Sequence, residues 1–209
     1  MQSRKILSLT RLLLVTCVFF GALGPQANAQ SLQKILQQEQ YTPFVAPKQT
    51  FASLISVGWR NQEQKDSNNL VFEIPNQLGP STMLIEYSKV SKHTQTEHLK
   101  LRNQEKILPK LPAYQQKAES RHTIGLQEVP MISGTYRFQG NAKYPRQIFQ
   151  TYLVHKRDGY VFTLDCSQKC SQSVIDDTTI FFLQFRPQPT QLDLKSLNTT
   201  TKKQTHIPY

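Results

Sequence analysis

The sequence lacks the short motifs by which many enzymes and nucleotide-binding proteins are identified. It contains no glycine-rich phosphate loop, no His-Glu-x-x-His zinc motif and no Gly-x-Ser-x-Gly nucleophile motif. Its three cysteines are too few for a paired-cysteine zinc framework, and its five histidines are scattered along the chain. We therefore expect no metal site and no bound cofactor, and no motif in the sequence names a reaction.

Long apolar runs are scarce as well. The one long run, residues 12–20, is too short to form a stable membrane span. Arg4 and Lys5 precede it, and residues 27–29 place small side chains at the −3 and −1 positions of a cleavage site. This arrangement predicts a signal peptide cleaved after Ala29. We expect the remainder to be exported without a membrane span, into the periplasm or out of the cell.

Acidic residues are few: 14 stand against 25 lysines and arginines, and the net charge is +11. Removal of Arg4, Lys5 and Arg11 with the signal peptide would lower this charge to +8. Such a surface attracts anionic lipid, lipopolysaccharide and acidic proteins. For an exported chain, cytoplasmic nucleic acid is not an expected partner. An excess of basic residues can also serve solubility alone, and this alternative stays open.

Two cysteines, Cys166 and Cys170, remain after the predicted cleavage. In an exported chain this pair predicts a disulfide. Closing so short a loop contributes only about 2 kcal/mol in the chain-entropy treatment, so the bridge would hold a turn rather than the fold. The pair does not have the Cys-x-x-Cys spacing of redox-active sites.

The most strongly patterned stretch is a predicted hairpin. Residues 147–155 and 160–165 are rich in β-branched and aromatic side chains, and Lys-Arg-Asp-Gly at 156–159 lies between them as a predicted turn. For a two-residue turn near Asp158, Leu153 and His155 share a face with Tyr160, and Tyr152 lies on the opposite face with Val161. Both faces are apolar, which predicts a central position in a sheet covered on each side.

The other predicted elements complete an α+β domain with an antiparallel sheet flanked by helices. The alternating patterns predict strands over 70–74, 82–87, 117–129 and 132–138. The first helix is predicted over 91–108, with Ser91 as N-cap and a narrow apolar stripe at Leu101 and Leu108. The last helix is predicted over 171–185, with Ser173 as N-cap and a stripe expected to pack on the sheet, formed by Val174, Thr178, Phe181, Phe182 and Phe185. The predicted organisation is a signal peptide (1–29), a leader and extended linker (30–50), one domain (51–186) and a disordered polar tail (187–209).

Four segments resemble the PsbP-like family. They are Gly-Thr-Tyr-Arg-Phe at 134–138, Arg-Gln-Ile-Phe-Gln-Thr-Tyr-Leu-Val at 146–154, Asp-Gly-Tyr-Val-Phe-Thr-Leu at 158–164 and Phe-Phe-Leu-Gln-Phe at 181–185. The resemblance spans about residues 51–185 and implies an antiparallel sheet between helices, in an α/β/α sandwich. It also implies protein binding or assembly without shared catalytic residues. The cysteine loop and the polar tail depart from the family pattern.

Three functional hypotheses follow. The first is an exported, non-enzymatic bacterial protein that binds an unidentified protein partner through a sheet edge or a basic helix. The second is a small secreted hydrolase that uses His155 with Asp158 or Asp165 for acid–base chemistry. The third is an envelope or virulence factor that binds a polyanion or anionic surface through basic residues on the first predicted helix and just after it. Those residues are Lys92, Lys100, Arg102, Lys106 and Lys110.

Aromatic and basic residues also interleave near the centre of the chain, as they do on nucleic-acid-binding surfaces. They are Tyr136, Arg137, Tyr144, Arg146 and Tyr152. No RNA-recognition motif accompanies them, and ordinary sheet patterning explains the same alternation.

Overall fold

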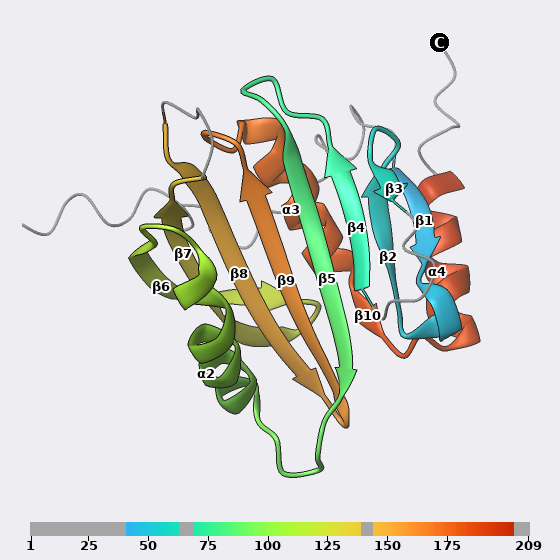
Figure 1. Ribbon diagram of the computed structural model, residues 1–209. Helices are drawn as coiled ribbons and strands as arrows, with labels where there is room; N and C mark the ends of the chain where they lie inside the picture. Colours follow the sequence, from blue (N-terminus) through green and yellow to red (C-terminus); the bar gives the residue numbers. More distant parts are fainter. Residues whose placement is uncertain (1–40, 63–68, 139–143, 203–209) are drawn as a thin grey trace, which may run out of the picture. The chain divides into compact units, whose positions relative to one another are not determined.

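Two antiparallel sheets and three α-helices make up the part of the chain that the computed structural model describes, residues 41–62, 69–138 and 144–202 (Figure 1). The predicted signal peptide and residues 30–40 of the predicted leader lie outside the described residues. The α+β class with antiparallel sheets is confirmed.

The larger sheet has seven strands, and the smaller one has three. In spatial order the large sheet consists of β3 (Arg60–Gln62), β4 (Asn69–Ile74), β5 (Ser81–Lys89), β9 (Asp158–Cys166), β8 (Arg146–His155), β7 (Gln127–Tyr136) and β6 (Gln115–Ile124). The small sheet consists of β1 (Tyr41–Val45), β2 (Phe51–Ser56) and β10 (Arg186–Pro187). The helices are α2 (Thr96–Ile107), α3 (Gln172–Gln184) and α4 (Gln191–Lys202), with short 3-10 turns η1 (Pro47–Gln49) and η2 (Leu108–Lys110).

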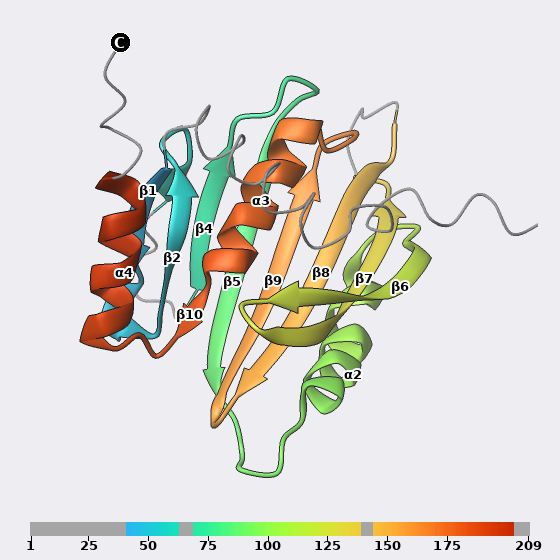
Figure 2. The ribbon, with the colours of Figure 1, turned by 180° about the vertical axis from the view of Figure 1, so that it is seen from behind.

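The large sheet is covered on both faces, as the apolar patterning of its central strands predicted. Helix α2 packs on one face, where Leu99 contacts a small cluster on β7, β8 and β9. Helix α3 and the small sheet lie on the other face (Figure 2). Helix α4 packs against β1 and β2.

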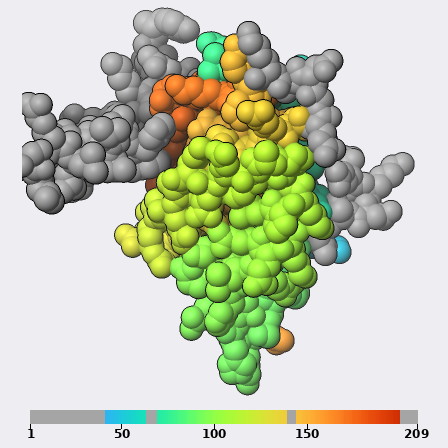
Figure 3. Space-filling view, turned by 60° about the vertical axis from the view of Figure 1, so that its left-hand side comes forward, coloured from blue at the N-terminus to red at the C-terminus, as the bar shows by residue number. Residues whose placement is uncertain are grey.

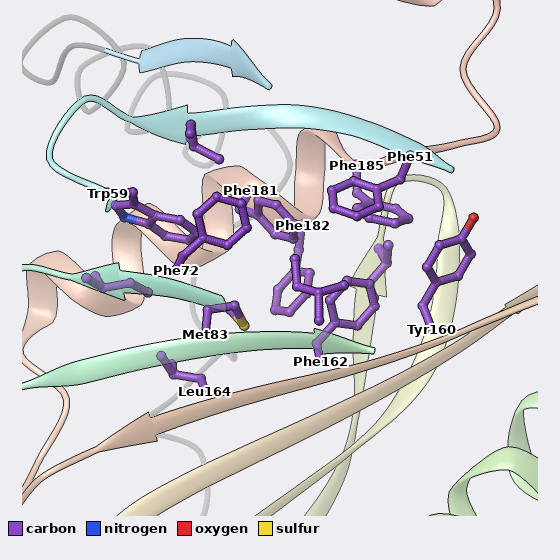
Figure 4. Close-up of a cluster of buried hydrophobic side chains, with 14 of the residues drawn as sticks. Phe51, Trp59, Phe72, Met83, Tyr160, Phe162, Leu164, Phe181, Phe182 and Phe185 are labelled. Atoms are coloured by element: carbon purple, nitrogen blue, oxygen red, sulfur yellow. The ribbon is translucent and has the colours of Figure 1, made fainter. Parts of the chain in front are cut away.

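The main core lies between the large sheet and the layer of α3 and β2 (Figure 4). Phe181 of α3 is fully buried and stacks at 5.8 Å on Trp59, with its ring also 6.2 Å from Phe51 and 6.2 Å from Phe162. All six residues of β2 are buried, which explains why this strand has no alternating pattern in sequence. The predicted burial of the aromatic stripe on the last helix is confirmed for Phe181, Phe182 and Phe185.

The central hairpin has the predicted faces, because Leu153 pairs with Tyr160 and Tyr152 pairs with Val161. The turn is shorter than the predicted segment 156–159. Lys156 and Arg157 form it, with Lys156 at a φ of 56°, and Asp158 already belongs to β9. The cause is tertiary: the Asp158 side chain is buried and hydrogen-bonded, which favours an extended backbone over a turn at this position.

The prediction of one strand over 117–129 was also wrong. The chain instead folds into a hairpin of β6 and β7, joined at Gly125, whose φ of +56° suits glycine. Strand β7 therefore starts at Gln127, before the predicted start at residue 132. Glycine inside an apparently continuous strand was the available sequence signal.

Both long helices begin away from the predicted caps. Helix α2 starts after Gln95 rather than Ser91, and α3 starts after Ser171, whose hydroxyl accepts a hydrogen bond from the Val174 amide, rather than after Ser173. Leu101 is 53% exposed instead of buried. A mostly polar helix has too few apolar side chains to indicate its buried face.

The ends of the described region are more ordered than predicted. Residues 41–45, predicted as extended linker, form β1, in which Tyr41 is buried and donates a hydrogen bond to Asp177. The predicted disorder of the tail is wrong up to Lys202, because β10 pairs with β2 and α4 buries Leu197 against the small sheet. Residues 203–209 lie outside the described part.

Candidate partner-binding surface

The acid–base pair of the hydrolase hypothesis does not assemble around Asp165. His155 pairs in register with Asp158, whereas Asp165 lies seven residues further along β9, about 23 Å away. Asp165 accepts hydrogen bonds from the Tyr136 hydroxyl and, at 2.9 Å, from Arg146 Nε. Its carboxylate therefore has a structural role at the opposite end of the hairpin.

The carboxylate of Asp158 likewise takes part in structural hydrogen bonds. Its buried carboxylate accepts hydrogen bonds from the Tyr87 hydroxyl at 2.8 Å, from Lys89 Nζ at 2.5 Å and from the Gln188 side chain. Burial by itself would raise the pKa of this carboxyl, but the three donors outweigh burial and lower it. Among the described residues no hydrogen bond joins His155 to Asp158. Burial and the neighbouring Lys156 lower the pKa of His155.

The basic residues on and around α2 divide into two groups. Lys92, Arg102, Lys106 and Lys110 are exposed, and within the described ranges no salt bridge engages them. Lys100 is different: its side chain is 10% exposed, and its ammonium pairs with Glu97 at 2.8 Å and with Glu119 of β6. Lys100 is therefore a link between α2 and β6 and is not available as a binding residue.

The cysteine prediction agrees with the structure. Cys166 and Cys170 form a disulfide between the end of β9 and the start of α3, and both residues are buried. This disulfide has a structural role, because it is buried, joins two elements and presents no reactive thiol at the surface.

Strand β6 forms one edge of the large sheet, and within the described residues no strand pairs with its outer side. Residues 115–121 and Thr123 are exposed, so neither face of most of this strand is covered. Figure 3 shows β6 and α2 side by side on the surface, in green to yellow-green. Lys100–Glu119 and Arg121–Glu97, the latter at 2.8 Å, join the strand to the helix.

The pairing of β6 with β7 identifies which backbone amides of β6 point outward. Pro130 of β7 lies opposite Arg121 and has no N–H to exchange, and the pairing of β7 with β8 starts only at Met131. We therefore take Arg121 and Pro130 as a non-hydrogen-bonded pair, in which the backbone groups of Arg121 face away from β7. By alternation, the backbone groups of Glu119 and Thr123 also face the open edge, and those of Ser120 face β7.

A pocket of about 440 Å³ lies at one end of this edge. It is lined by Ala113, Gln115, Lys117, Thr135, Arg137 and Pro145. Gln115 and Thr135 are cross-strand partners, and Lys117 occupies the register shift between Gln116 and Ala118. The bulge directs Lys117 toward the pocket, where its ammonium donates to the Gln115 side chain at 3.0 Å.

The interleaved aromatic and basic residues are only partly at the surface. Tyr152 is fully buried, and Tyr136 is buried with its hydroxyl on Asp165. Arg146 lies over the rings of Tyr136 and Phe138, at 5.8 and 5.5 Å, while it pairs with Asp165. Of the basic residues in this group, Arg137 is the one that lines the pocket, and Tyr144 is exposed. A continuous nucleic-acid surface does not result.

The pocket could not be predicted from the sequence, because Lys117 and Arg137 lie at unremarkable spacing and are brought together only by the pairing of β6 with β7. Within the described ranges, no group of three or more His, Cys, Asp or Glu side chains is arranged to hold a metal ion. No helix of the described residues is long and apolar enough to cross a membrane.

Comparisons with known proteins support the fold. No protein-family model and no curated protein matches the chain. A crystal structure from Bacteroides thetaiotaomicron is similar with a TM-score of 0.53 and 10% identity, over 73% of this chain and 50% of that one. The chain thus spans half the length of that protein.

Two further structures are similar over most of their own length. Cyanobacterial PsbP (CyanoP) from Synechocystis matches with a TM-score of 0.51 and 10% identity, over 71% of this chain and 93% of that chain. LpqN from Mycobacterium tuberculosis, described as involved in cell envelope biogenesis, matches with a TM-score of 0.49 and 16% identity, over 77% and 96%. The match to CyanoP confirms, at the level of architecture, the resemblance inferred from the sequence: the chain has a PsbP-like fold.

Proposed function

We propose that this protein is exported and acts without catalysis, by binding a protein partner through the open edge of strand β6. The observation that carries the proposal is the exposure of β6 along nearly its whole length, with outward backbone groups at Glu119, Arg121 and Thr123. An extended segment of a partner can add to such an edge through main-chain hydrogen bonds, while its side chains provide specificity.

The composition of β6 fits selective pairing. Exposed edges invite uncontrolled association between copies, and charged side chains and bulges are the usual protection against it. Strand β6 carries Lys117, Glu119 and Arg121 and has a register shift next to Ala118. These features disfavour pairing between identical edges, where like charges would meet, and leave pairing with a segment of matching charge favourable.

The proposed edge can be tested with one position and two substitutions. Arg121→Pro removes an outward N–H, whereas Arg121→Ala removes the same side-chain charge and keeps the N–H. Partners captured from envelope extract by the wild-type protein should be retained by Arg121→Ala and lost with Arg121→Pro. The two variants should melt within a few degrees of each other, because the outward amide is not used within the sheet.

Retention of the same partner by Arg121→Pro, with its melting temperature unchanged, would contradict binding through this edge. A large loss of stability in Arg121→Pro would show instead that the amide faces β7. Ser120→Pro provides the comparison, since its amide should face β7 and its substitution should destabilise the sheet.

Export is proposed on the N-terminal pattern and is supported by the disulfide between Cys166 and Cys170, a type of bond that persists in oxidising compartments. Mass spectrometry of protein recovered from periplasm and culture medium tests it. We expect a mature N-terminus at Gln30 and an oxidised cysteine pair. An intact N-terminus in the cytoplasmic fraction would contradict the proposal.

Polyanion binding through α2 is a second candidate, favoured by the exposed Arg102 and Lys106, which lie one turn apart and which no salt bridge engages in the described part of the chain. The double variant Arg102→Glu/Lys106→Glu should elute from heparin resin at clearly lower salt than Lys48→Glu/Lys195→Glu, which reverses two exposed lysines elsewhere and changes the net charge by the same amount. Equal elution of the two variants would show that only net charge matters.

A further inference from the structure

The pocket at the end of β6 has a lining that favours a negatively charged ligand. Among the described residues that line it, Lys117 and Arg137 carry formal charges and none is a carboxylate. Within the described residues no salt bridge engages either cation. By contrast, the nearby Arg146 is already neutralised by Asp165 at 2.9 Å.

The pocket wall is held in place by backbone contacts. The amide of Arg137 donates to the Pro112 carbonyl at 2.9 Å, which ties the end of β7 to the segment that leads into β6. Thr135 is paired with Gln115 across the two strands. The two cations therefore project from a paired hairpin, and binding a ligand does not require this wall to fold first.

The position of the pocket connects it to the open edge. Gln115 and Lys117 belong to β6 itself, so a strand added along β6 would place its side chains beside theirs, at the spacing of neighbouring strands. A side chain of that added strand on the pocket face would lie between the cations. The added strand would by itself place an anionic side chain in the pocket.

We propose that the partner segment is an acidic extended peptide, and that the pocket receives one of its carboxylates between Lys117 and Arg137. This inference rests on the proposed strand addition at β6 and specifies the chemistry of its partner. The complementary charge of the pocket and the main-chain groups of the edge together select a peptide over other anions, since only a peptide can use both.

The test uses two synthetic ten-residue peptides with blocked ends, one alternating glutamate and threonine and the other alternating glutamine and threonine. Their dissociation constants are measured by fluorescence anisotropy with the whole mature protein at low salt. The glutamate peptide should bind about tenfold more tightly, as expected for two partly exposed charge pairs.

Substitution of either cation should remove part of this difference. Lys117→Gln and Arg137→Gln should each weaken binding of the glutamate peptide by about 2- to 10-fold and leave the glutamine peptide unchanged. Lys195→Gln, the matched loss of an exposed lysine on α4, should change neither. Arg121→Pro should weaken both peptides, because both use the edge.

Three outcomes would overturn the inference. Equal affinity for the two peptides would show that the pocket does not recognise carboxylate. An equal effect of Lys195→Gln would show that only net charge acts. Binding of an acidic oligosaccharide that depends on Lys117 but not on the outward amide of Arg121 would assign the pocket to a carbohydrate. If the two peptides bind equally but Arg121→Pro no longer binds the glutamine peptide, strand addition at β6 stays supported while the carboxylate site in the pocket does not.

Discussion

His122 should make the stability of this protein depend on pH between about 7 and 4. The residue lies on β6 opposite Val129, and its ring contacts the Phe182 ring edge to face at 4.9 Å. Burial lowers the pKa of His122 from 6.5 to about 4. The folded protein therefore holds this imidazole neutral at a pH where the unfolded chain already binds a proton.

The sign and size of the effect follow from this difference. Because the folded pKa is depressed, stability is full above the unfolded value of about 6.5 and falls as pH decreases toward the folded value. The linkage relation gives a loss of about 2 kcal/mol between pH 7 and pH 5, and about 3 kcal/mol once both states are protonated.

Urea unfolding of the oxidised protein at pH 7 and pH 5 measures this loss. His122→Gln changes stability by a constant amount through lost packing, but it should reduce the difference between the two pH values by about 2 kcal/mol. His93→Gln, a matched change at an exposed histidine before α2, should leave the difference as in the wild type. If His122→Gln loses as much stability as the wild type between pH 7 and pH 5, His122 is not held neutral by burial.

Three other perturbations test the core, the bridge and the buried carboxylate. Phe181→Ala should lower the free energy of unfolding by about 3–5 kcal/mol, because it empties a fully buried site in contact with four rings or more; a loss under 1 kcal/mol in urea unfolding would contradict this. Cys166→Ala/Cys170→Ala should cost about 2 kcal/mol, the entropy of a short loop, measured by the same assay; failure to fold would mean that the bridge does more than close a turn. Asp158→Asn should cost about 1.5–3 kcal/mol at pH 7, since it weakens charge-assisted hydrogen bonds. The pKa of this carboxyl is lowered in the folded protein, so the difference between Asp158→Asn and the wild type should shrink as pH falls through the folded pKa; a difference that stays constant in acid would refute the charge argument.

The pairing of β8 with β9 shows what the alternation of side chains in the sequence can predict. Leu153 and Tyr160 share one face, and Tyr152 and Val161 the other, as the period of two requires once a turn is assumed. The same reasoning could not decide where the turn ends, because Asp-Gly is typical of turns and its role as the start of β9 depends on Tyr87 and Lys89 from another strand.

The candidate surface was predictable only in part. The exposed Arg102 and Lys106 were recognised as basic side chains on a helix, but Lys100 was indistinguishable from them in sequence. Its burial follows from Glu119, which reaches it from β6 and compensates for the loss of hydration. The pocket at Lys117 and Arg137 depends likewise on two strands and a bulge that place distant residues side by side.

Local rules thus determined what each segment of this protein can be: two apolar faces on β8 and β9, an aromatic stripe on α3, and a disulfide between two cysteines four positions apart. These follow from side-chain period and chain proximity, which sequence contains. Tertiary structure alone decided which charges are paired, which strand lies at the edge and that the polar tail folds as α4 on the small sheet. Those outcomes depend on contacts between residues far apart in the chain. Such contacts contribute to stability only after the strands of the sheet have paired.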